Sequence, residues 1–419
     1  MSAPGAGAAR RTSQALALAA AFLSLFSIVG FALYGLPFFY NFYVSELGWT
    51  RQAVTSGNAY SKVAAAVLFG LVAGVIVDAA GPRRLLLFGI PLAGAAVFGL
   101  STVTAASLPL FHFFYLLNAA GYVFGGPLPS QVLLSRFFDA GRGRAMGVAY
   151  FGIGIGGAVV GQLAPVLIDG LGWRGALRAL AILMVVLAFP AAWLVREPKP
   201  LAAAAAPRER LWPGVRASLS ELPGFLRGML RQRAFFLLAI GSMASIGAVG
   251  GTIQNLKLYL SLDRGFGEAQ AGDVLTTILL GSLVGRLLMG WLADAWPRKH
   301  VMLLVYGVVA LTIPLVYLAP SGPPLTAAAF LFGIGLGGDY MIVPLMAADL
   351  FGLARMGRVM GILLTADGVA EAVVPMAVAT SRDTSGSYAP GVALLVALAA
   401  LGAFAVAFLP RRPVATADA

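Results

Sequence analysis

The sequence predicts an all-α polytopic membrane protein whose twelve transmembrane helices form two six-helix bundles. Three observations lead to this fold class. Of the 419 residues, 59% are hydrophobic and 11% are charged, whereas a soluble globular protein carries about 25% charged residues. Apolar segments of about 20 residues, the length that spans a bilayer, recur along the whole chain. Short motifs of the first half also return in the second half at nearly constant spacing.

Each expected span is an apolar segment bounded by polar or basic residues. The first begins after Arg10 and Arg11, a pattern that superficially resembles a signal peptide. Its apolar run is too long and no small-residue cleavage site follows, so we expect a retained span. The twelve spans are placed at residues 15–44, 52–77, 84–106, 108–135, 144–168, 175–195, 234–261, 269–293, 300–319, 324–350, 358–380 and 388–409.

The placement of the basic residues explains the formal net charge of +12. Most of the 29 Lys and Arg lie in the termini and the even-numbered connections, while the opposite side holds Arg51, Arg174, Arg178, Arg264 and Arg382. This asymmetry follows the positive-inside rule, so we expect both termini in the cytoplasm and the chain in the plasma (inner) membrane. The basic excess is therefore topological and argues against nucleic-acid binding.

The longest polar stretch divides the chain into two halves. We expect six-helix bundles at residues 1–195 and 234–419. Between them lies a cytoplasmic linker, residues 196–233, whose basic segment VRASLSELPGFLRGMLRQR is expected to be amphipathic and to lie on the inner membrane surface.

Two motifs indicate that the halves are a tandem duplication. GVIVDAAGPRR at 74–84 returns as GWLADAWPRKH at 290–300, an offset of 216 residues. GRAMG at 143–147 returns as GRVMG at 357–361, an offset of 214 residues. Matches at nearly one offset and at equivalent places in the topology indicate an internal repeat. Parallel repeats of this kind place a substrate site between the halves, near the middle of the membrane.

The first of these motifs also resembles a known family. Its pattern G-x-x-x-D-x-x-G-x-R-R, at residues 74–84, resembles the signature loop of major facilitator superfamily transporters. With the twelve spans, GWR at 172–174 and REP at the end of the first half, the resemblance covers the whole chain. Within the superfamily the chain is most similar to the monocarboxylate transporter and oxalate–formate antiporter group, through LYGLPFFYNFYVSELGWTR (33–51), MLRQRAFFLL (229–238), GRLLMGWLADAWPRK (285–299) and GGDYMIVPLMAADLFG (337–352).

The resemblance implies a cytoplasmic gate at this loop. In the family, an acid and its basic neighbours form ion pairs that hold the inner face closed, which here implies roles for Asp78, Arg83 and Arg84. Asp294, Arg298 and Lys299 repeat the arrangement, although proline replaces the turn glycine there. The alternative is that these basic residues only enforce topology.

Four charged residues lie deep within expected spans, where charge is costly and marks a functional site by default. Counted along the helices from the inner surface, Arg286, Asp339 and Asp367 all reach depths of about 12–15 Å. Glu371 lies one helical turn beyond Asp367, on the same helix face. We expect Asp339, Asp367 or Glu371 to gain and lose the coupling proton, the alternative being a permanently protonated or paired structural acid.

Arg286 needs an anion, because a guanidinium does not lose its proton. Its planar fork suits a carboxylate, and the family resemblance places a substrate-binding arginine at Arg286 and a substrate-lining tyrosine at Tyr340. A structural Arg–Asp pair is the alternative. A second positively charged side chain, which would bind the other carboxylate of a dicarboxylate, is missing from its usual place. Asp367 stands where oxalate-type relatives carry a lysine. Lys62 could replace it or snorkel outward.

Further polar residues are candidates for lining the same cavity, namely Tyr34, Asn118 and Tyr122. We therefore expect a secondary transporter of a small, monocarboxylate-like organic anion, coupled to protons or exchanging, and acting as a monomer in the bilayer. A proton-driven exporter of cationic or amphipathic compounds is the alternative, and a non-transporting receptor or scaffold is a third reading. With no cysteine, nucleophile motif, metal cluster or nucleotide-binding loop, we expect neither an enzyme nor a cofactor or metal site.

Overall fold

The computed structural model describes residues 4–197 and 211–410, and every regular element of that part is helical. The chain forms two compact units. Unit 1 comprises the residues up to Ala140, Val148–Leu222 and Leu353–Thr365, and unit 2 comprises Gly141–Gly147, Pro223–Gly352 and the residues from Ala366 onward. Two long helices, α8 and α15, therefore each contribute a short N-terminal segment to one unit and their remainder to the other.

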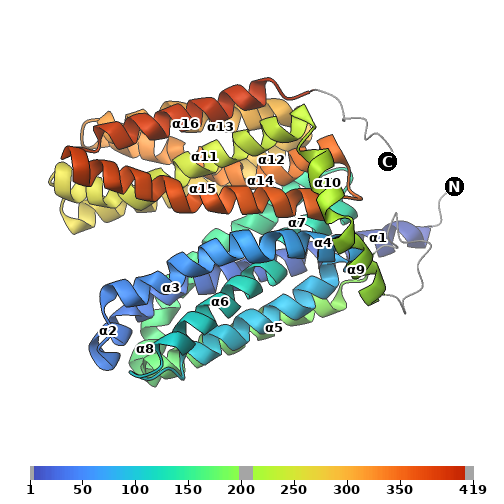
Figure 1. Ribbon diagram of the computed structural model, residues 1–419, viewed down its shortest axis with the longest axis horizontal. Helices are drawn as coiled ribbons and strands as arrows, with labels where there is room; N and C mark the ends of the chain where they lie inside the picture. The colour runs from blue at the N-terminus through green and yellow to red at the C-terminus, as the bar shows by residue number, and fades with distance from the viewer. Residues whose placement is uncertain (1–3, 198–210, 411–419) are drawn as a thin grey trace. The chain divides into compact units, whose positions relative to one another are not determined.

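Unit 1 contains the elements of the first half of the chain, several of which are long helices that run alongside one another, as α5 and α6 do (Figure 1). In chain order they are α1 (Pro4–Ser24), η1 (Leu25–Leu33), η2 (Leu36–Phe39), α2 (Tyr40–Leu47), α3 (Arg51–Ala64), η3 (Ala65–Phe69), α4 (Gly70–Ala80), α5 (Pro82–Leu100), α6 (Leu108–Gly125), α7 (Pro127–Phe137), most of α8 (Arg142–Leu194) and α9 (Leu211–Ser220).

Unit 2 contains the elements of the second half. They are α10 (Leu222–Met229), α11 (Arg233–Leu258), η5 (Tyr259–Asp263), α12 (Glu268–Ala295), α13 (Arg298–Leu318), α14 (Pro323–Phe351), most of α15 (Met356–Ser385) and α16 (Ala389–Ala407). Helices α12 and α14 share an extensive contact, and α16 packs against both α11 and α13 (Figure 1).

The described part of the chain has eleven helices long and apolar enough to cross a membrane. The longest, α8, has 53 residues and is broken at Gly172, whose φ of 68° and ψ of 163° are not helical. It therefore contains two predicted spans, 144–168 and 175–195. The all-helical fold class predicted from hydropathy is confirmed.

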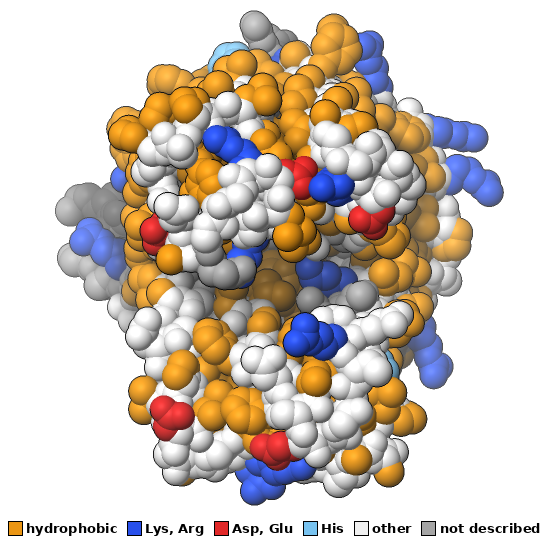
Figure 2. Space-filling view, turned by 90° about the vertical axis from the view of Figure 1, so that its left-hand side faces the viewer, with side chains coloured by type: hydrophobic (Ala, Val, Ile, Leu, Met, Phe, Trp, Pro, Cys, Tyr) orange, Lys and Arg blue, Asp and Glu red, His pale blue; other side chains and the backbone are white. Residues whose placement is uncertain are grey.

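Large hydrophobic side chains on the surface agree with a lipid environment. Figure 2 looks onto one end of the helices, where hydrophobic side chains are mixed with backbone, basic and acidic groups. On the surface as a whole, Leu262, Leu311 and Leu318 are each more than 70% exposed. Water would penalise such a surface, whereas hydrocarbon does not. In the predicted linker, α9 packs against α4 and α10 follows it. Residues 198–210, and Arg411 and Arg412 near the C-terminus, lie outside the described residues.

Close helix packing in unit 1 depends on glycine at the crossing of α5 and α6. A Cβ atom added to Gly89 would lie 2.1 Å from the backbone nitrogen of Gly125, whereas one added to Gly161 would meet nothing within 4 Å. We expect Gly89→Ala to destabilise the protein by about 1–3 kcal/mol, because the helix backbones must separate. Thermal unfolding in detergent, followed by tryptophan fluorescence, measures the change. Gly161→Ala is the control, and equal melting temperatures for the two variants would contradict this account of the crossing.

Candidate functional site

Two of the acids predicted at membrane depth lie together in unit 2. The side chains of Asp339 on α14 and Asp367 on α15 are 0% and 5% exposed. Ser242 Oγ donates to Asp367 Oδ2 over 2.8 Å, and Ser245 Oγ donates to Asp339 Oδ2 over 3.1 Å. Both serines belong to α11, three residues apart, so they lie on one helix face. One face of α11 therefore holds both carboxyl groups.

A buried tyrosine completes this group, which we call the acid–tyrosine cluster: Ser242, Ser245, Tyr306, Asp339 and Asp367. Tyr306 on α13 is 0% exposed and interacts electrostatically with both acids. Two carboxyl oxygens of the cluster, Asp339 Oδ1 and Asp367 Oδ1, are buried without a hydrogen-bond partner. The hydroxyl of Tyr306 lies within reach of Ser242 and Asp339 but makes no hydrogen bond of regular geometry. The ion pairs of the described residues include neither acid. The cluster thus holds two carboxyl groups without a recorded counter-ion.

Small residues set the position of α14 within unit 2. A Cβ atom added to Gly333 would lie 2.2 Å from the carbonyl oxygen of Ile278, and one added to Gly337 would lie 2.2 Å from that of Ser282. Glycine at these positions lets α14 approach α12 closely. Asp339 follows two residues after Gly337 and lies on the buried part of the helix.

Glu371 lies near the cluster but is not part of it. As predicted, Asp367 and Glu371 belong to one helix, α15, and they interact electrostatically. A Cβ atom added to Gly250 on α11 would lie 3.3 Å from Glu371 Cγ. Since Ser242 precedes Gly250 by two turns of the same helix, Glu371 faces a different level of α11 than the acid pair does.

Arg286 and Tyr340 lie half-buried in unit 2. The backbone nitrogen of Arg286 would be 2.9 Å from a Cβ atom added to Gly337, so the arginine is anchored beside α14. Both side chains are engaged in interactions, but the ion pairs of the described residues contain no Arg286–Asp339 or Arg286–Asp367 pair. The structure brings the two acids together and does not record Arg286 as their partner.

The remaining candidate binding residues belong to unit 1. Asn118 and Tyr122 are one turn apart on α6, and the buried Oδ1 atom of Asn118 has no hydrogen-bond partner. Tyr34 follows the π-helical segment η1 and packs its ring against Gly157 of α8. Lys62 lies in the last turn of α3, directly before the π-helical segment η3. Such π-helical turns frequently occur at functional sites.

Asp78 binds the start of a distant helix rather than its neighbouring arginines. Its carboxylate accepts hydrogen bonds from the backbone nitrogens of Gly357 and Arg358, over 2.8 and 2.9 Å, and its Oδ2 lies 4.0 Å from Arg358 Nε. An acid at this position satisfies free N–H groups of α15 and complements the helix dipole. The expectation that Asp78 pairs with Arg83 and Arg84 is not what the structure records.

Asp294 repeats this geometry in unit 2. It accepts hydrogen bonds from the backbone nitrogens of Gly143 and Arg144, over 2.7 and 2.9 Å, at the start of α8. Arg144 Nε also lies 3.1 Å from Asp294 Oδ2. Each repeated aspartate therefore binds the Gly-Arg pair of the other repeated motif, as the predicted duplication would require.

The basic residues of both loops have other partners. Arg83 donates its Nη2 to the carbonyl of Trp193 over 2.7 Å. Arg298 pairs with Asp349, and Lys299 Nζ donates to the carbonyls of Ala407 and Leu409 over 2.8 and 2.6 Å. These contacts tie the loops to the ends of neighbouring helices. Arg84 remains a candidate by position alone.

Sequence reasoning missed four residues with clear roles in these sites. Ser242, Ser245 and Tyr306 are ordinary in apolar helices, so nothing local distinguishes them. Glu197, in the REP segment, accepts a hydrogen bond from the Arg83 backbone nitrogen over 2.6 Å and pairs with Arg136 over 3.3 Å. Burial raises the pKa of Glu197, and the hydrogen bond and arginine charges oppose that rise. Its position two residues after Val195, the last apolar residue of the predicted span, was the one available signal.

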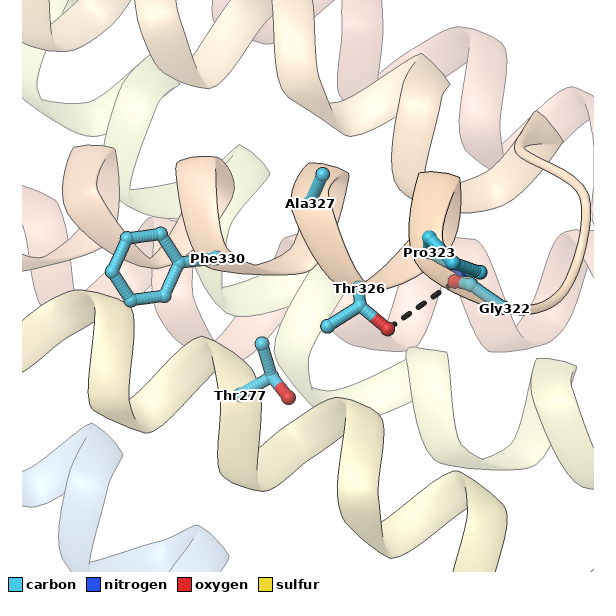
Figure 3. Close-up of a pocket in the computed structure, with 6 residues that line it drawn as sticks. All are labelled: Thr277, Gly322, Pro323, Thr326, Ala327 and Phe330. Atoms are coloured by element: carbon cyan, nitrogen blue, oxygen red, sulfur yellow. Dashed lines mark hydrogen bonds between the residues drawn. The ribbon is translucent and has the colours of Figure 1, made fainter.

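A surface depression lies elsewhere in unit 2. It is lined by Thr277 of α12 and by residues around the start of α14, where Thr326 Oγ1 donates to the Gly322 carbonyl over 3.2 Å (Figure 3). The lining is mostly apolar and contains none of the predicted site residues. We assign it no function.

Comparison with known proteins places the chain in a family. The family model for the Major Facilitator Superfamily matches residues 20–272 and 238–418. The chain therefore belongs to the Major Facilitator Superfamily, whose members are membrane transporters. In solved structures it is similar to the fucose transporter FucP in the outward conformation, with a TM-score of 0.73 and 13% identity over 95% of this chain and 98% of that one. It also resembles the human organic anion transporter MFSD10, with a TM-score of 0.68 and 15% identity over 96% and 99%.

Sequence relatives lie within the same superfamily. The chain is 30% identical to human monocarboxylate transporter 11 over 298 residues, which covers 68% of this chain and 59% of that protein. Three monocarboxylate transporters are matched over only 58–63% of their length. The chain is 26% identical to a probable nitrate/nitrite transporter of Mycobacterium tuberculosis, NarK2, over 87% of this chain and 90% of that one.

Asp78 and Asp294 each cap the start of a helix, so the same loss of stability is expected when either is removed. Asp78→Ala and Asp294→Ala each leave two helix N-terminal N–H groups without their acceptor, so each should lower the free energy of unfolding by about 0.5–2 kcal/mol. Thermal unfolding of the full chain in detergent measures both. Asp139→Ala is the control, because the Asp139 side chain is 76% exposed and its ion pair with Arg10 lies at the surface. If the control loses as much stability as the two cap variants, the capping account is wrong.

Proposed function

We propose that the chain is a secondary active transporter of a small, monocarboxylate-like organic anion, which it moves by alternating access. The observation that carries the proposal is Arg286. It is an arginine predicted to lie at membrane depth, in a superfamily member whose sequence relatives include named monocarboxylate transporters. A permanently charged guanidinium at that depth needs an anion, and a carboxylate matches its planar fork.

The named relatives also support an anionic substrate. Several are monocarboxylate transporters, and NarK2 is named as a probable carrier of nitrate and nitrite. In this proposal Arg286 binds the carboxylate, and Tyr340, Tyr122, Asn118, Tyr34 and Lys62 contribute hydrogen bonds or charge. The substrate class rests on this chemistry and on those names.

Proton coupling is the second part of the proposal. Asp339, Asp367 and Glu371 are three acids within the membrane-spanning helices α14 and α15. A buried carboxyl group can lose its charge by binding a proton, which avoids the cost of an unpaired ion in a medium of low polarity. Exposure to each side of the membrane in turn would then couple proton movement to substrate movement.

The cytoplasmic gate and the topology complete the proposal. We assign gating to Asp78 and Asp294 with their neighbours Arg83, Arg84, Arg298 and Lys299, because partly buried polar contacts can break and re-form during transport. The positive-inside pattern supports cytoplasmic termini in the plasma (inner) membrane. The chain would act as a monomer.

One observation favours a second function, proton-driven export of cationic or amphipathic compounds. The acid–tyrosine cluster holds two carboxyl groups that the ion pairs of the described residues do not include, an arrangement that would attract a cationic substrate. One relative, 26% identical over 71% of this chain, is named as a fujikurins efflux protein. Relative to anion transport, this function would depend on Asp339 and Asp367 rather than on Arg286.

Uptake of radiolabelled lactate into proteoliposomes, with an imposed pH gradient, tests the anion reading. We expect Arg286→Ala to raise the half-saturating concentration about 10- to 100-fold, because a charge-assisted bond contributes about 1.5–3 kcal/mol. Arg51→Ala is the control, because Arg51 is exposed at the start of α3.

The same assay with pyruvate, formate, oxalate and a cationic dye separates the two functions. If none of the acids is transported and Arg286→Ala changes no flux, the anion reading fails. Dye export that is lost in Asp367→Asn would instead favour the exporter.

A further inference from the structure

We propose that Asp339 and Asp367 bind the coupling proton as one unit, with Tyr306 as the shared third oxygen and Ser242 and Ser245 as positioning residues. This inference rests on the proposed proton coupling and deepens it. It replaces three separate candidate acids by one defined proton-binding site within unit 2.

The hydrogen-bond inventory of the acid–tyrosine cluster carries the proposal. Each carboxyl group has one oxygen, Oδ2, that accepts from a serine of α11. Its other oxygen, Oδ1, is buried and has no hydrogen-bond partner. The hydroxyl of Tyr306 lies within hydrogen-bonding reach of Asp339 and Ser242 but makes no hydrogen bond of regular geometry. Leaving such groups without partners is costly. The cluster is therefore incomplete as a set of donors and acceptors.

One added proton supplies the hydrogen-bond donor that the oxygens of the cluster lack. Without it, the two orphan carboxylate oxygens are only acceptors, and Tyr306 supplies a single donor. With a proton on one carboxyl group, that group donates to Tyr306 Oη, and Tyr306 donates to the other carboxylate. The proton can pass between the acids as Tyr306 gives its own proton to one and receives one from the other. This exchange conserves both protons and charge.

Electrostatic repulsion between the two acids also favours one bound proton. Asp339 and Asp367 interact electrostatically with each other, and two like charges in one buried site cannot both be ionised at low cost. Of the helices around the cluster, α16 has no charged residue, α15 adds the acid Glu371, and α13 contributes Tyr306. Helix α11 carries Lys257 and helix α12 carries Arg286, each of which has interactions of its own. The ion pairs of the described residues include neither Asp339 nor Asp367.

The serine hydroxyls donate to the acids over 2.8 and 3.1 Å, which are hydrogen-bond lengths. These bonds occupy one oxygen of each carboxyl group, so the other oxygen would be open to a sodium ion as well as to a proton. The salt exchange described below separates the two occupants. The acids are also 0% and 5% exposed, so they are closely surrounded by protein.

Infrared difference spectroscopy of the purified full chain, titrated with pH, tests the proposal. The C=O stretch of a protonated carboxylic acid reports the site directly and does not require transport. We expect Asp339→Asn and Asp367→Asn each to alter the titration of the remaining acid. Tyr306→Phe should move the midpoint of the carboxylic acid titration by about one pH unit, which corresponds to the loss of one hydrogen bond of about 1.4 kcal/mol. Ser245→Ala should also shift it, while leaving both acids in place.

Tyr317→Phe is the matched control. Tyr317 is on the same helix, is 1% exposed and has an unpartnered hydroxyl, but its neighbours are Tyr259 and Tyr388 rather than acids. Its substitution should leave the carboxylic acid band unchanged.

Several outcomes would overturn the inference. Independent titration of the two acids, with each Asn variant leaving the other's midpoint unchanged, would exclude one unit. An unshifted titration midpoint in Tyr306→Phe would show that Tyr306 takes no part in binding the proton. Loss of the protonated band when NaCl replaces choline chloride at fixed pH would identify a sodium site instead. Absence of anion flux with the band behaviour intact would count against the proposed function alone.

Discussion

The cost of leaving a polar group without a partner inside hydrocarbon governs the arrangement of this molecule. A bilayer supplies no water to a buried carboxylate or to a free backbone N–H group, so each must find its partner within the protein. Asp339 and Asp367 find one serine each on α11. Asp78 and Asp294 satisfy the free N–H groups at the starts of α15 and α8. In the acid–tyrosine cluster, Oδ1 of each acid has no such partner, and it is there that we infer a bound proton.

The two aspartate caps show how a duplicated sequence produces a repeated interaction. Asp78 and Asp294 occupy equivalent places in the two motifs, and each binds the backbone of a Gly-Arg pair that is itself repeated. Glycine is required in that pair by close packing, because a Cβ atom on Gly357 or Gly143 would collide with the facing helix within about 2.5 Å. A cap made of backbone hydrogen bonds contributes little on each occasion and can be broken and re-formed. That property suits a contact proposed to act as a gate.

Much of the fold was predictable, because hydropathy and repeated motifs are local properties of the chain. The apolar helices and the break between 144–168 and 175–195 follow from counting residues along the chain. The partners of Asp339 and Asp367 were not predictable. A serine in an apolar helix carries no signal until packing decides which face of α11 meets α14 and α15. Asp78 was expected to pair with Arg83 and Arg84, its neighbours in sequence, yet the approach of α15 offers it two backbone donors instead. Short-range reasoning identifies charged residues well and their tertiary partners poorly.

The anion and the proton of the proposed function meet in one process, the proton-driven accumulation of an organic anion. Its most direct measurement is uptake of a labelled monocarboxylate into proteoliposomes that contain equal anion concentrations on both sides and are acidic outside only. The account predicts net accumulation against the resulting anion gradient, collapse of that accumulation by a protonophore, and its loss in Asp339→Asn and Asp367→Asn while exchange of anion for anion persists. Accumulation that is indifferent to the protonophore, or no accumulation in the presence of a pH gradient, would contradict it.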